Sequence, residues 1–436
     1  MASLDDLNSG KLAGQKHVRL NEGLTEFPKA LFELADTLEV LDLNSNELSS
    51  LPDDFGRFKK LRILFLSNNP FTVLPEVLSD CPALSMVGFK NNKISQVPEN
   101  SLPDQLRWLI LTDNEITALP QSIGRLNKLQ KCMLAGNQLT DLPEEMANCR
   151  SIELLRLSAN HFEAIPDFVF DLPKLTWLTF AGNPLHQAFE NQLDLPSISF
   201  GDLTLEDVLG EGASGVISRA IWSSPPSDLA EEQGEVAVKV FKSDVTSDGY
   251  PQDEMKACLA AGRHPNLVHQ LARVTDAARS GLVMRLIGAE YRNLGLPPTF
   301  ETCTRDVFAS DLVLSAEQAL HIARQMTDVL QHLRAHQICH GDLYAHNTLI
   351  NADSHVLFGD FGGAANYASL PQDQAERLER VEVRALACLF EDLVSLVPIP
   401  DREAPQIKSL IELIQDCMST PVTARPDVRT IRARLG

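Results

Sequence analysis

Hydrophobic and polar positions in the first half of the chain repeat with a period of 22 or 23 residues. Each repeat places apolar residues in the frame Leu-x-x-Leu-x-Leu, as in Leu38, Leu41 and Leu43, and an asparagine follows three residues later. This frame predicts one short strand per repeat, whose leucines share a core that no repeat can form alone. We expect the asparagine to turn inward and satisfy backbone groups where the chain leaves the strand. The recurring asparagines are Asn46, Asn69, Asn92, Asn114, Asn137, Asn160 and Asn183.

The pattern changes after Asn183. A strand-like stretch precedes Gly210, and residues 235–241 alternate in the manner of a strand. Further along, Ser315 and Gln318 have the spacing of a capping box, which predicts that a helix begins there. The apolar face expected for that helix comprises Leu320, Ala323, Met326, Leu330 and Leu333.

Composition narrows the choice of partners. The formal net charge is -21, so the surface repels phosphate backbones and anionic lipid headgroups. Nucleic acid and bare membrane are therefore poor partners, whereas a basic or neutral protein would suit this surface. The same charge could equally serve solubility alone.

The cysteines and the N-terminal segment suggest a compartment. The eight cysteines form no Cys-x-x-Cys pair, so we expect reduced thiols in a cytoplasmic setting. The first residues do not have the layout of a signal peptide, and no apolar run reaches membrane-spanning length. Delivery into a host cell by a dedicated secretion machine would leave no signal peptide, and it stays an open alternative.

The repeat frame resembles the leucine-rich repeat family of the short, 23-residue type. This resemblance implies an α/β solenoid with caps over residues 1–196, followed by a linker over 197–203. The positions beside the last two leucines of the frame face the concave side of such a solenoid. Apolar side chains there are expected to bind a protein partner, unless neighbouring strands or another part of the chain cover them. They are Ile63, Phe65, Met86, Trp108, Ile110, Met133, Leu154 and Trp177.

Chemistry-bearing residues gather in the second half. Gly210, Gly212 and Gly215 have the spacing Gly-x-Gly-x-x-Gly, which lets the backbone approach phosphate oxygens and offer its amides to them. Alone, this spacing could equally indicate a dinucleotide site. It is followed by Lys239 on the alternating strand, and then by two further polar motifs. These motifs are His-Gly-Asp-Leu-Tyr-Ala-His-Asn at 340–347 and Asp-Phe-Gly at 360–362.

In order and spacing, these residues resemble the protein kinase family over residues 204–436. In detail they resemble bacterial kinases whose His-Gly-Asp-Leu-Tyr-Ala-His-Asn loop follows leucine-rich repeats. The resemblance implies an α+β bilobal domain, with an N-lobe over about 204–284 and a C-lobe over about 285–436. It also implies ATP and Mg²⁺ as cofactors.

The resemblance assigns roles to individual residues. Lys239 is expected to hold the α- and β-phosphates and Glu254 to fix that lysine, while Asn347 and Asp360 bind Mg²⁺. Asp342 is expected to orient the acceptor hydroxyl and take its proton. Around the nucleotide the resemblance places Gly210, Glu211, Gly212, Ala213, Ser214, Gly215, Ile217, Ala237, Lys239, Met284, Leu286 and Leu349.

Several positions depart from the family pattern. Gly341 replaces the usual arginine before the catalytic aspartate, and Tyr344 stands where serine/threonine kinases carry a lysine. No Ala-Pro-Glu follows Asp-Phe-Gly, and Glu382 takes the acidic position of the next helix after an unusually short segment. Arg425 thereby loses its expected partner. His340 and His346 are both interpreted as structural, with His340 in the core.

The leading hypothesis is an active protein kinase with a serine or threonine acceptor rather than tyrosine, whose repeats choose the substrate. A small-molecule phosphotransferase of the aminoglycoside-kinase type and an inert kinase-like scaffold are the alternatives. Gly341 cannot supply the cation that captures a phosphorylated activation loop, and the short segment offers only Tyr367 and Ser369 as acceptors. We therefore expect that phosphorylation of this loop is not required.

Overall fold

The structure is a computed structural model, and it describes residues 2–185, 193–212, 214–242, 245–246, 248–276 and 279–436. Contacts divide the chain into two compact units, Met1–Leu175 and Thr176–Gly436. The sequence predicts that the solenoid ends at residue 196. The contacts instead place the strand of the last repeat in the second unit. The predicted architecture, a repeat solenoid followed by an α+β domain, is confirmed.

The first unit is a parallel sheet with one three-residue strand per repeat. Consecutive strands pair in register, so that Ile63 lies beside Met86 and Met86 beside Trp108. The leucines of the frame point into the core, and Leu38, Leu41 and Leu43 are fully buried. The strands are β1 (His17–Arg19), β2 (Val40–Asp42), β3 (Ile63–Phe65), β4 (Met86–Gly88), β5 (Trp108–Ile110), β6 (Lys131–Met133) and β7 (Leu154–Arg156).

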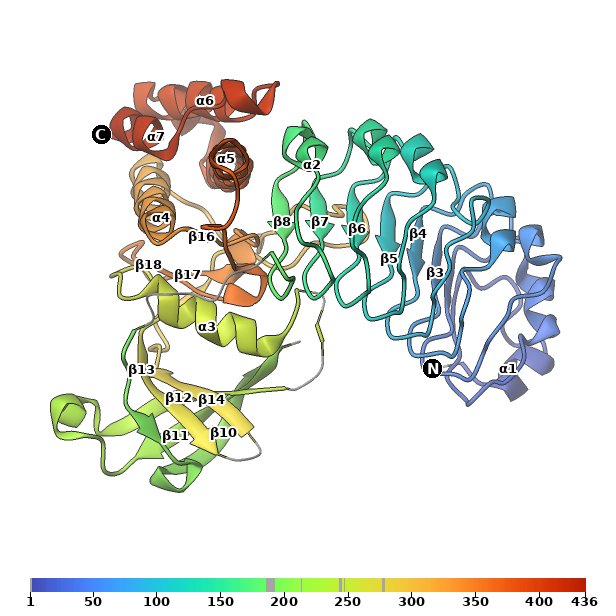
Figure 1. The fold of residues 1–436 in the computed structure, drawn as a ribbon, viewed down its shortest axis with the longest axis horizontal. Coiled ribbons are helices and arrows are strands. Elements are labelled where there is room, and N and C mark those ends of the chain that lie inside the picture. The colour runs from blue at the N-terminus through green and yellow to red at the C-terminus, as the bar shows by residue number, and fades with distance from the viewer. Residues whose placement is uncertain (1, 186–192, 213, 243–244, 247, 277–278) are drawn as a thin grey trace. The chain divides into compact units, whose positions relative to one another are not determined.

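Short helical turns form the other side of most repeats (Figure 1), whereas the segment between β4 and β5 contains no helical turn, and α1 (Leu4–Asn8) precedes the first strand. Near the N-terminus their interior is aromatic, because Phe32 stacks on Phe58 with ring centroids 5.2 Å apart. The turns are α1 (Leu4–Asn8), η1 (Lys29–Leu34), η2 (Phe55–Arg57), η3 (Glu76–Asp80), η4 (Gln121–Arg125), η5 (Glu144–Asn148) and α2 (Asp167–Asp171).

The asparagines tie each repeat to the one before it, as the sequence predicts. Asn69 shows the pattern, since its Nδ2 donates to Leu43 O of the preceding repeat at 3.0 Å and to Leu66 O of its own at 3.1 Å. Its Oδ1 accepts from Leu48 N at 2.9 Å. Every recurring asparagine is buried, so these bonds satisfy backbone groups that water cannot reach.

The second unit begins with β8 (Trp177–Thr179), the strand of the last repeat. It continues with a twisted sheet whose strand order is β10-β11-β12-β14-β13-β9. Helix α3 (Pro251–Ala261) connects β12 to β13. The sheet strands are β9 (Ser197–Ile198), β10 (Leu203–Glu211), β11 (Gly215–Trp222), β12 (Gly234–Phe241), β13 (Gln270–Asp276) and β14 (Arg279–Arg285). Its 3-10 turns are η6 (Phe200–Asp202) and η7 (Ser227–Glu232).

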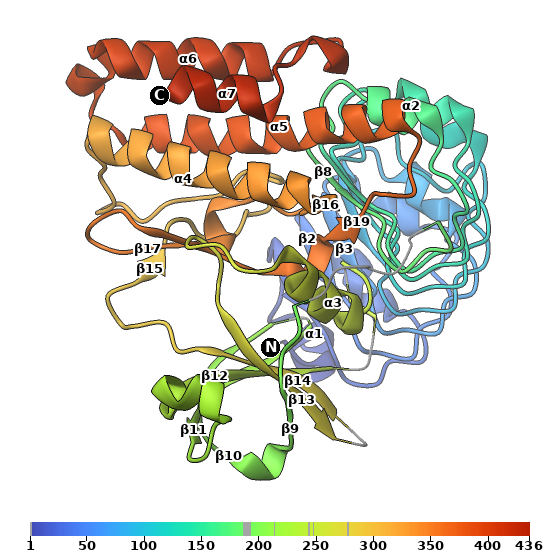
Figure 2. The ribbon, with the colours of Figure 1, turned by 60° about the vertical axis from the view of Figure 1, so that its left-hand side comes forward.

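The rest of the second unit is mainly helical. Helix α4 begins with the predicted capping box of Ser315 and Gln318, and its expected apolar face is buried. Figure 2 shows the helices side by side, with α5 packed against both α4 and α6. They are α4 (Ala316–Ala335), α5 (Gln372–Leu396), α6 (Pro405–Cys417) and α7 (Val428–Leu435).

Short strands and turns precede and connect these helices, and those between α4 and α5 carry loops of the site. The strands are β15 (Arg292–Asn293), β16 (Ile338–Cys339), β17 (Thr348–Ile350), β18 (Val356–Phe358) and β19 (Ala365–Asn366). The turns are η8 (Ala345–Asn347), η9 (Phe361–Gly363), η10 (Ile399–Glu403) and η11 (Val422–Ala424).

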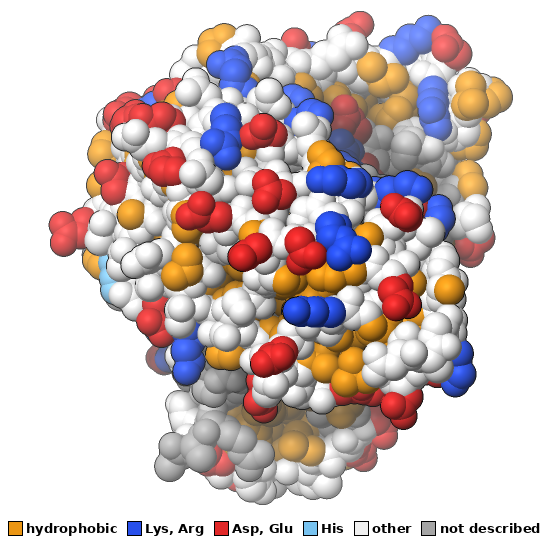
Figure 3. Space-filling model, turned by 90° about the vertical axis from the view of Figure 1, so that its right-hand side faces the viewer, with side chains coloured by type: hydrophobic (Ala, Val, Ile, Leu, Met, Phe, Trp, Pro, Cys, Tyr) orange, Lys and Arg blue, Asp and Glu red, His pale blue; other side chains and the backbone are white. Residues whose placement is uncertain are grey.

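The surface charges, the cysteines and the helix lengths can be compared with the expectations from composition. On the face in Figure 3, acidic and basic side chains are intermixed, with hydrophobic side chains between them. All eight cysteines are buried. Within the residues that the structure describes, no helix has both the length and the apolar character needed to cross a membrane.

Candidate active site

The glycine-rich turn joins β10 to β11, and its glycines have different physical roles. A Cβ on Gly210 or Gly212 would meet nothing within 4 Å, so these two leave open space beside the turn. A Cβ on Gly215 would lie 2.5 Å from Val240 O, so this glycine is required for β11 to pack against β12. At Gly210 and Gly212 no side chain therefore stands between the turn and a ligand, while the Gly212 amide donates to Gly215 O within the turn at 2.9 Å. Ala213, expected here from the sequence, lies outside the described residues.

Lys239 lies on the central strand β12, opposite Ile217 of β11 and Leu282 of β14. Its Nζ forms an ion pair with Glu254 Oε1 of helix α3, as the resemblance implies. Burial lowers the pKa of Lys239, but the negative charges of Glu254 and Asp360 outweigh it and leave the pKa raised. The lysine is therefore a fixed positive charge at the back of the cleft.

Asp342 and Asn347 are joined within the loop between β16 and β17. The Asn347 Nδ2 donates to both the backbone oxygen and the Oδ2 of Asp342, each at 3.0 Å. This pair orients the Asp342 carboxylate and uses the amide nitrogen of Asn347. Its amide oxygen is then the atom suited to bind a cation.

Asp360 follows β18 and has a left-handed backbone with φ of 56°. Its carboxylate is crowded by protein atoms although solvent reaches it through the cleft. Desolvation and the nearby Glu254 charge raise its pKa to about 6, while Lys239 acts in the opposite direction. A carboxylate and an amide oxygen are the donor types that Mg²⁺ prefers, so Asp360 and Asn347 fit the expected metal.

One cleft of about 610 Å³ collects most of the predicted residues. Of the predicted residues, those lining it are Gly210, Gly212, Ser214, Gly215, Ile217, Ala237, Lys239, Glu254, Met284, Leu286, Asn347, Leu349 and Asp360. Glu211 is not among them, because its carboxylate pairs with Lys242 at 2.9 Å. Asp342 adjoins the cleft through its bonds to Asn347.

Other lining residues escaped the sequence interpretation. Val268, Leu282 and Leu357 add apolar walls from the loop before β13, from β14 and from β18, and Gln270 of β13 adds a polar side chain. Strand alternation could have suggested that some of them share a face. It could not show that this face borders the nucleotide cleft.

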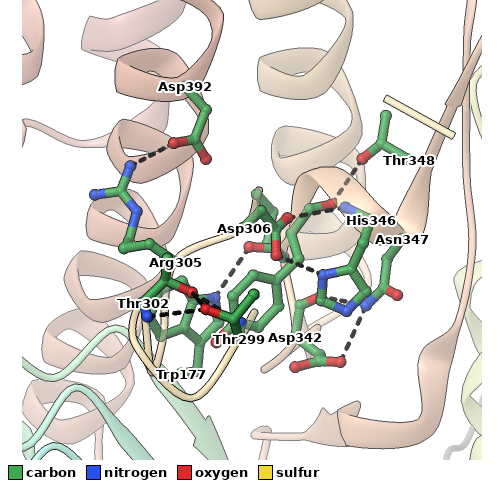
Figure 4. Close-up of polar contacts among 12 residues, drawn as sticks. Trp177, Thr299, Thr302, Arg305, Asp306, Asp342, His346, Asn347, Thr348 and Asp392 are labelled. Atoms are coloured by element: carbon green, nitrogen blue, oxygen red, sulfur yellow. Dashed lines mark hydrogen bonds and ion pairs between the residues drawn. The ribbon is translucent and has the colours of Figure 1, made fainter. Parts of the chain in front are cut away.

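His346 also lines the cleft, and its partner is remote in sequence. Asp306 accepts from the His346 backbone N at 2.9 Å and contacts its Nδ1 at 2.7 Å (Figure 4). Burial lowers the pKa of His346, but Asp306 and the more distant Asp342 and Asp360 raise it overall. The loop that carries Asp306 is itself held by Arg305, which bonds to Asp392 at 2.6 Å.

The buried base of the catalytic loop is held by α5. Glu382 accepts from the backbone N of His340 at 2.6 Å and from that of Gly341 at 3.2 Å. Burial raises the pKa of Glu382 to about 7, although these two N–H donors act to lower it. His340 is fully buried and packs on Phe358 with ring centroids 4.3 Å apart.

Trp177 requires a correction to the sequence interpretation. It was expected on a concave face open to a partner, but it is buried, and its ring stacks on Tyr344 of the catalytic loop. Its indole N–H also donates to Leu343 O at 3.0 Å. An external partner cannot reach this ring, so Trp177 does not belong to a partner-binding surface.

The other departures from the kinase pattern also find a physical account. Arg425 is buried and donates to the backbone oxygens of Arg380 at 2.9 Å and Ser419 at 3.2 Å. Burial and the nearby Arg384 lower its pKa to about 10. In this chain, which lacks Ala-Pro-Glu, the Arg425 guanidinium therefore bonds to backbone oxygens instead of the glutamate expected from the family pattern.

Comparisons with known proteins give a family for each part of the chain. Residues 203–395 match the family described as protein tyrosine and serine/threonine kinase. Residues 17–71, 36–94 and 104–162 match the leucine rich repeat family. The family match identifies the domain over residues 203–395 as a protein kinase domain. The chain as a whole consists of leucine-rich repeats followed by that domain.

Individual relatives are distant. Fibroblast growth factor receptor 1 of Pleurodeles waltl is 27% identical over 166 residues, which is 37% of this chain and 20% of that protein. The Xenopus laevis receptor is 26% identical over the same shares. The chain thus spans about a fifth of the length of these curated relatives. The solved structure of Leptospira interrogans LRR protein LIC12759 has 32% sequence identity and a TM-score of 0.32, covering 38% of this chain and 48% of that one.

The raised pKa of Glu382 predicts a pH-dependent stability. A carboxyl whose folded pKa is raised stabilises the fold most below its unfolded pKa, and this contribution is lost as pH rises through the folded value. We expect Glu382 to make a contribution to the free energy of unfolding that decreases as the pH rises from about 4.5 to 7. Glu382→Gln keeps an oxygen acceptor and should remove that contribution. Urea unfolding at pH 5, 6 and 7 measures it.

The matched control is Glu376→Gln, the same chemical change at an exposed position of α5. It should keep the wild-type pH dependence. If the stability of the Glu382→Gln variant changes with pH in parallel with wild type, Glu382 is not the group that titrates.

Proposed function

We propose that this chain is an ATP- and Mg²⁺-dependent protein kinase that transfers the γ-phosphate to a serine or threonine hydroxyl of a protein. The main support is that one cleft is lined by Lys239, Glu254, Asn347 and Asp360, and that Asp342 lies beside it. A cleft of about 610 Å³ falls within the range of small-molecule sites. Its walls are largely apolar, which suits an adenine ring, and its charged residues suit a triphosphate.

Each charged residue has a step in this reaction. Lys239 binds the α- and β-phosphates, held in place by Glu254, and the backbone of the glycine-rich turn covers them. Asp342 accepts the proton of the acceptor hydroxyl. The hydroxyl oxygen forms a bond to the γ-phosphorus as the bond from that phosphorus to ADP breaks and ADP leaves. Asn347 and Asp360 would hold Mg²⁺, which when bound neutralises charge on the phosphate oxygens.

We further infer that the kinase is active without phosphorylation of its activation segment. Tyr367 is buried and donates to Glu379 at 3.0 Å, and burial raises its pKa far above the usual range. Ser369 donates to Leu185 O at 2.7 Å. Both hydroxyls are thus engaged inside the fold, and a dianion beside Glu379 would be repelled.

The proposed chemistry predicts the loss of phosphoryl transfer in Lys239→Ala and in Asp360→Ala. Each removes a charge that stabilises the transition state, where one such contact typically contributes about a hundredfold or more in rate. Radiolabelled ATP with purified protein and a test substrate measures transfer, and acid hydrolysis of the product identifies the acceptor. Circular dichroism checks that the variants fold.

Lys256→Ala is the control for loss of a lysine. It lies on α3, is half-exposed and pairs only locally with Asp253, so it should retain wild-type transfer. Equal incorporation by wild type and Asp360→Ala would refute the proposed reaction. Phosphotyrosine as the sole product would refute the acceptor class.

The activation segment gives a separate prediction. The double variant Tyr367→Phe, Ser369→Ala and phosphatase-treated wild type should both keep kcat within about a factor of three of untreated wild type, a change equivalent to less than 1 kcal/mol. Steady-state kinetics measures this, with thermal unfolding as the check on folding. A folded protein that loses its activity under either treatment would identify this segment as a phosphorylation switch.

The repeats supply the proposed protein-binding surface, now without Trp177 and without Ile63, Met86 and Leu154, which are buried as well. Phe65, Trp108, Ile110 and Met133 are half-buried on strands β3, β5 and β6 of the parallel sheet, with β4 between β3 and β5. Within this unit Lys131 Nζ lies 4.3 Å from the Trp108 ring centroid, and the indole Nε1 contacts Met133 Sδ at 3.3 Å. A column of preformed aromatic and sulfur contacts is the kind of surface that anchors a protein partner.

Trp108→Ala should raise the KM for a protein substrate about fivefold or more with kcat unchanged, because loss of an interface anchor costs about 1 kcal/mol or more. The assay uses the better of two test substrates, a histone and casein. Val73→Ala removes an exposed apolar side chain outside the strands and serves as control. An unchanged KM in the Trp108 variant would exclude this face from substrate capture.

A further inference from the structure

The strand of the last repeat, β8, contacts the catalytic loop on the C-terminal side of Asp342. The indole N–H of Trp177 donates to Leu343 O at 3.0 Å, and its ring stacks on Tyr344 with centroids 4.3 Å apart and planes inclined by 9°. Figure 4 shows Trp177 beside the loop that bears Asp342. Trp177 is only 2% exposed, so this contact is a packed one. It fixes the two residues that directly follow Asp342.

The same strand also contacts the N-terminal side of Asp342. Gly341 has φ of 68°, and a Cβ there would lie 2.6 Å from Leu178 O and 2.7 Å from Gly363 O. No side chain fits between the loop and these two backbones. The glycine in place of the family's arginine is therefore what lets β8 approach the loop this closely.

Strand β8 is itself anchored to the parts that surround the loop. Arg384 of α5 donates to Thr176 Oγ1 at 3.1 Å, at the start of the strand. Ser369 of the activation segment donates to Leu185 O at 2.7 Å, beyond the end of the strand. The segment 176–185 thus contacts α5 and the activation segment, while the contacts with the catalytic loop itself come from Trp177 and Leu178.

The contacts of β8 lie where other kinases carry the arginine that binds a phosphorylated activation loop. An arginine before the catalytic aspartate captures a phosphorylated loop and thereby orders the catalytic loop. Here Gly341 removes the cation, while β8 on one side and Glu382 of α5 on the other hold the same backbone. The ordering is built into the chain and needs no modification.

We propose that β8 is a positioning element of the kinase reaction, in which Trp177 holds Leu343 and Tyr344 so that Asp342 keeps the orientation for accepting a proton. This inference rests on the proposed kinase function. It makes the last repeat strand part of the catalytic domain, which then begins at Thr176. Trp177 does not line the nucleotide cleft, so it should affect the chemical step and not ATP binding.

The test uses the full chain with Trp177→Ala and Trp177→Phe. Because small displacements of a catalytic group cost up to about a hundredfold in rate, Trp177→Ala should lower kcat about tenfold or more. The KM for ATP should stay within about a factor of two. Trp177→Phe keeps the stacking but loses the hydrogen bond, so its kcat should lie between the two. Leu410→Ala, a buried change on α6 away from the loop, should leave kcat unchanged and controls for lost stability.

Gly341 allows a second test that does not depend on Trp177. Gly341→Ala should lower kcat, because its Cβ must push the loop away from β8. Gly23→Ala is the matched control, since Gly23 has φ of 67° and a Cβ there meets nothing within 4 Å. It introduces the same backbone strain without a clash, and it should keep wild-type kcat.

Hydrogen exchange separates this inference from the proposed function. Residues 338–347 should exchange faster in Trp177→Ala than in wild type or Leu410→Ala, whether or not the protein transfers phosphate. If exchange is faster in Trp177→Ala but the wild type transfers no phosphate, the proposed reaction is refuted, yet the positioning of the loop by β8 is supported. An active wild type with unchanged kcat and exchange in Trp177→Ala would overturn the inference, as would equal losses of kcat in Trp177→Ala and Leu410→Ala.

Discussion

The catalytic loop passes through a left-handed turn at Gly341, where the backbone oxygens of Leu178 and Gly363 leave no room for a Cβ. Much of the second unit depends on this close approach. It brings β8 against the loop, lets Trp177 reach Leu343 O, and leaves both loop amides free to bond to Glu382. An arginine at this position would separate the strand from the loop. Gly341 removes the arginine that the family carries here, and it thereby allows β8 to support the catalytic loop instead.

The cleft shows the cost of bringing charges together before a ligand arrives. Glu254 and Asp360 both face Lys239, which cannot neutralise the two of them, and the pKa of Asp360 is accordingly raised to about 6. A bound cation would relieve this repulsion and favour the ionised carboxylate. The repulsion between Glu254 and Asp360 is thus consistent with the proposed cation site.

Much of this could be predicted from the sequence, because the repeat frame and the kinase spacing are local patterns. The asparagine bonds and the α4 capping box follow from such patterns, and the ion pair of Lys239 with Glu254 follows from the resemblance to kinases. Contacts between distant segments could not be found in this way. The period assigns Trp177 to a strand face but cannot tell what covers it, and no local signal joins Asp306 to His346. Nor does spacing separate Gly215, required by packing, from Gly210 and Gly212, which leave the turn open.

The division of the chain after Leu175 has a consequence for how such proteins change over evolutionary time. In a solenoid each unit contacts only its neighbours, so whole repeats can be duplicated or deleted with little effect elsewhere. That freedom applies to the strands from β1 to β7. The last repeat is different, because Thr176, Trp177 and Leu178 all contact the catalytic domain. In related chains, the number of repeats should therefore vary ahead of this one, while the tryptophan of the final strand and the glycine it faces are inherited or lost together.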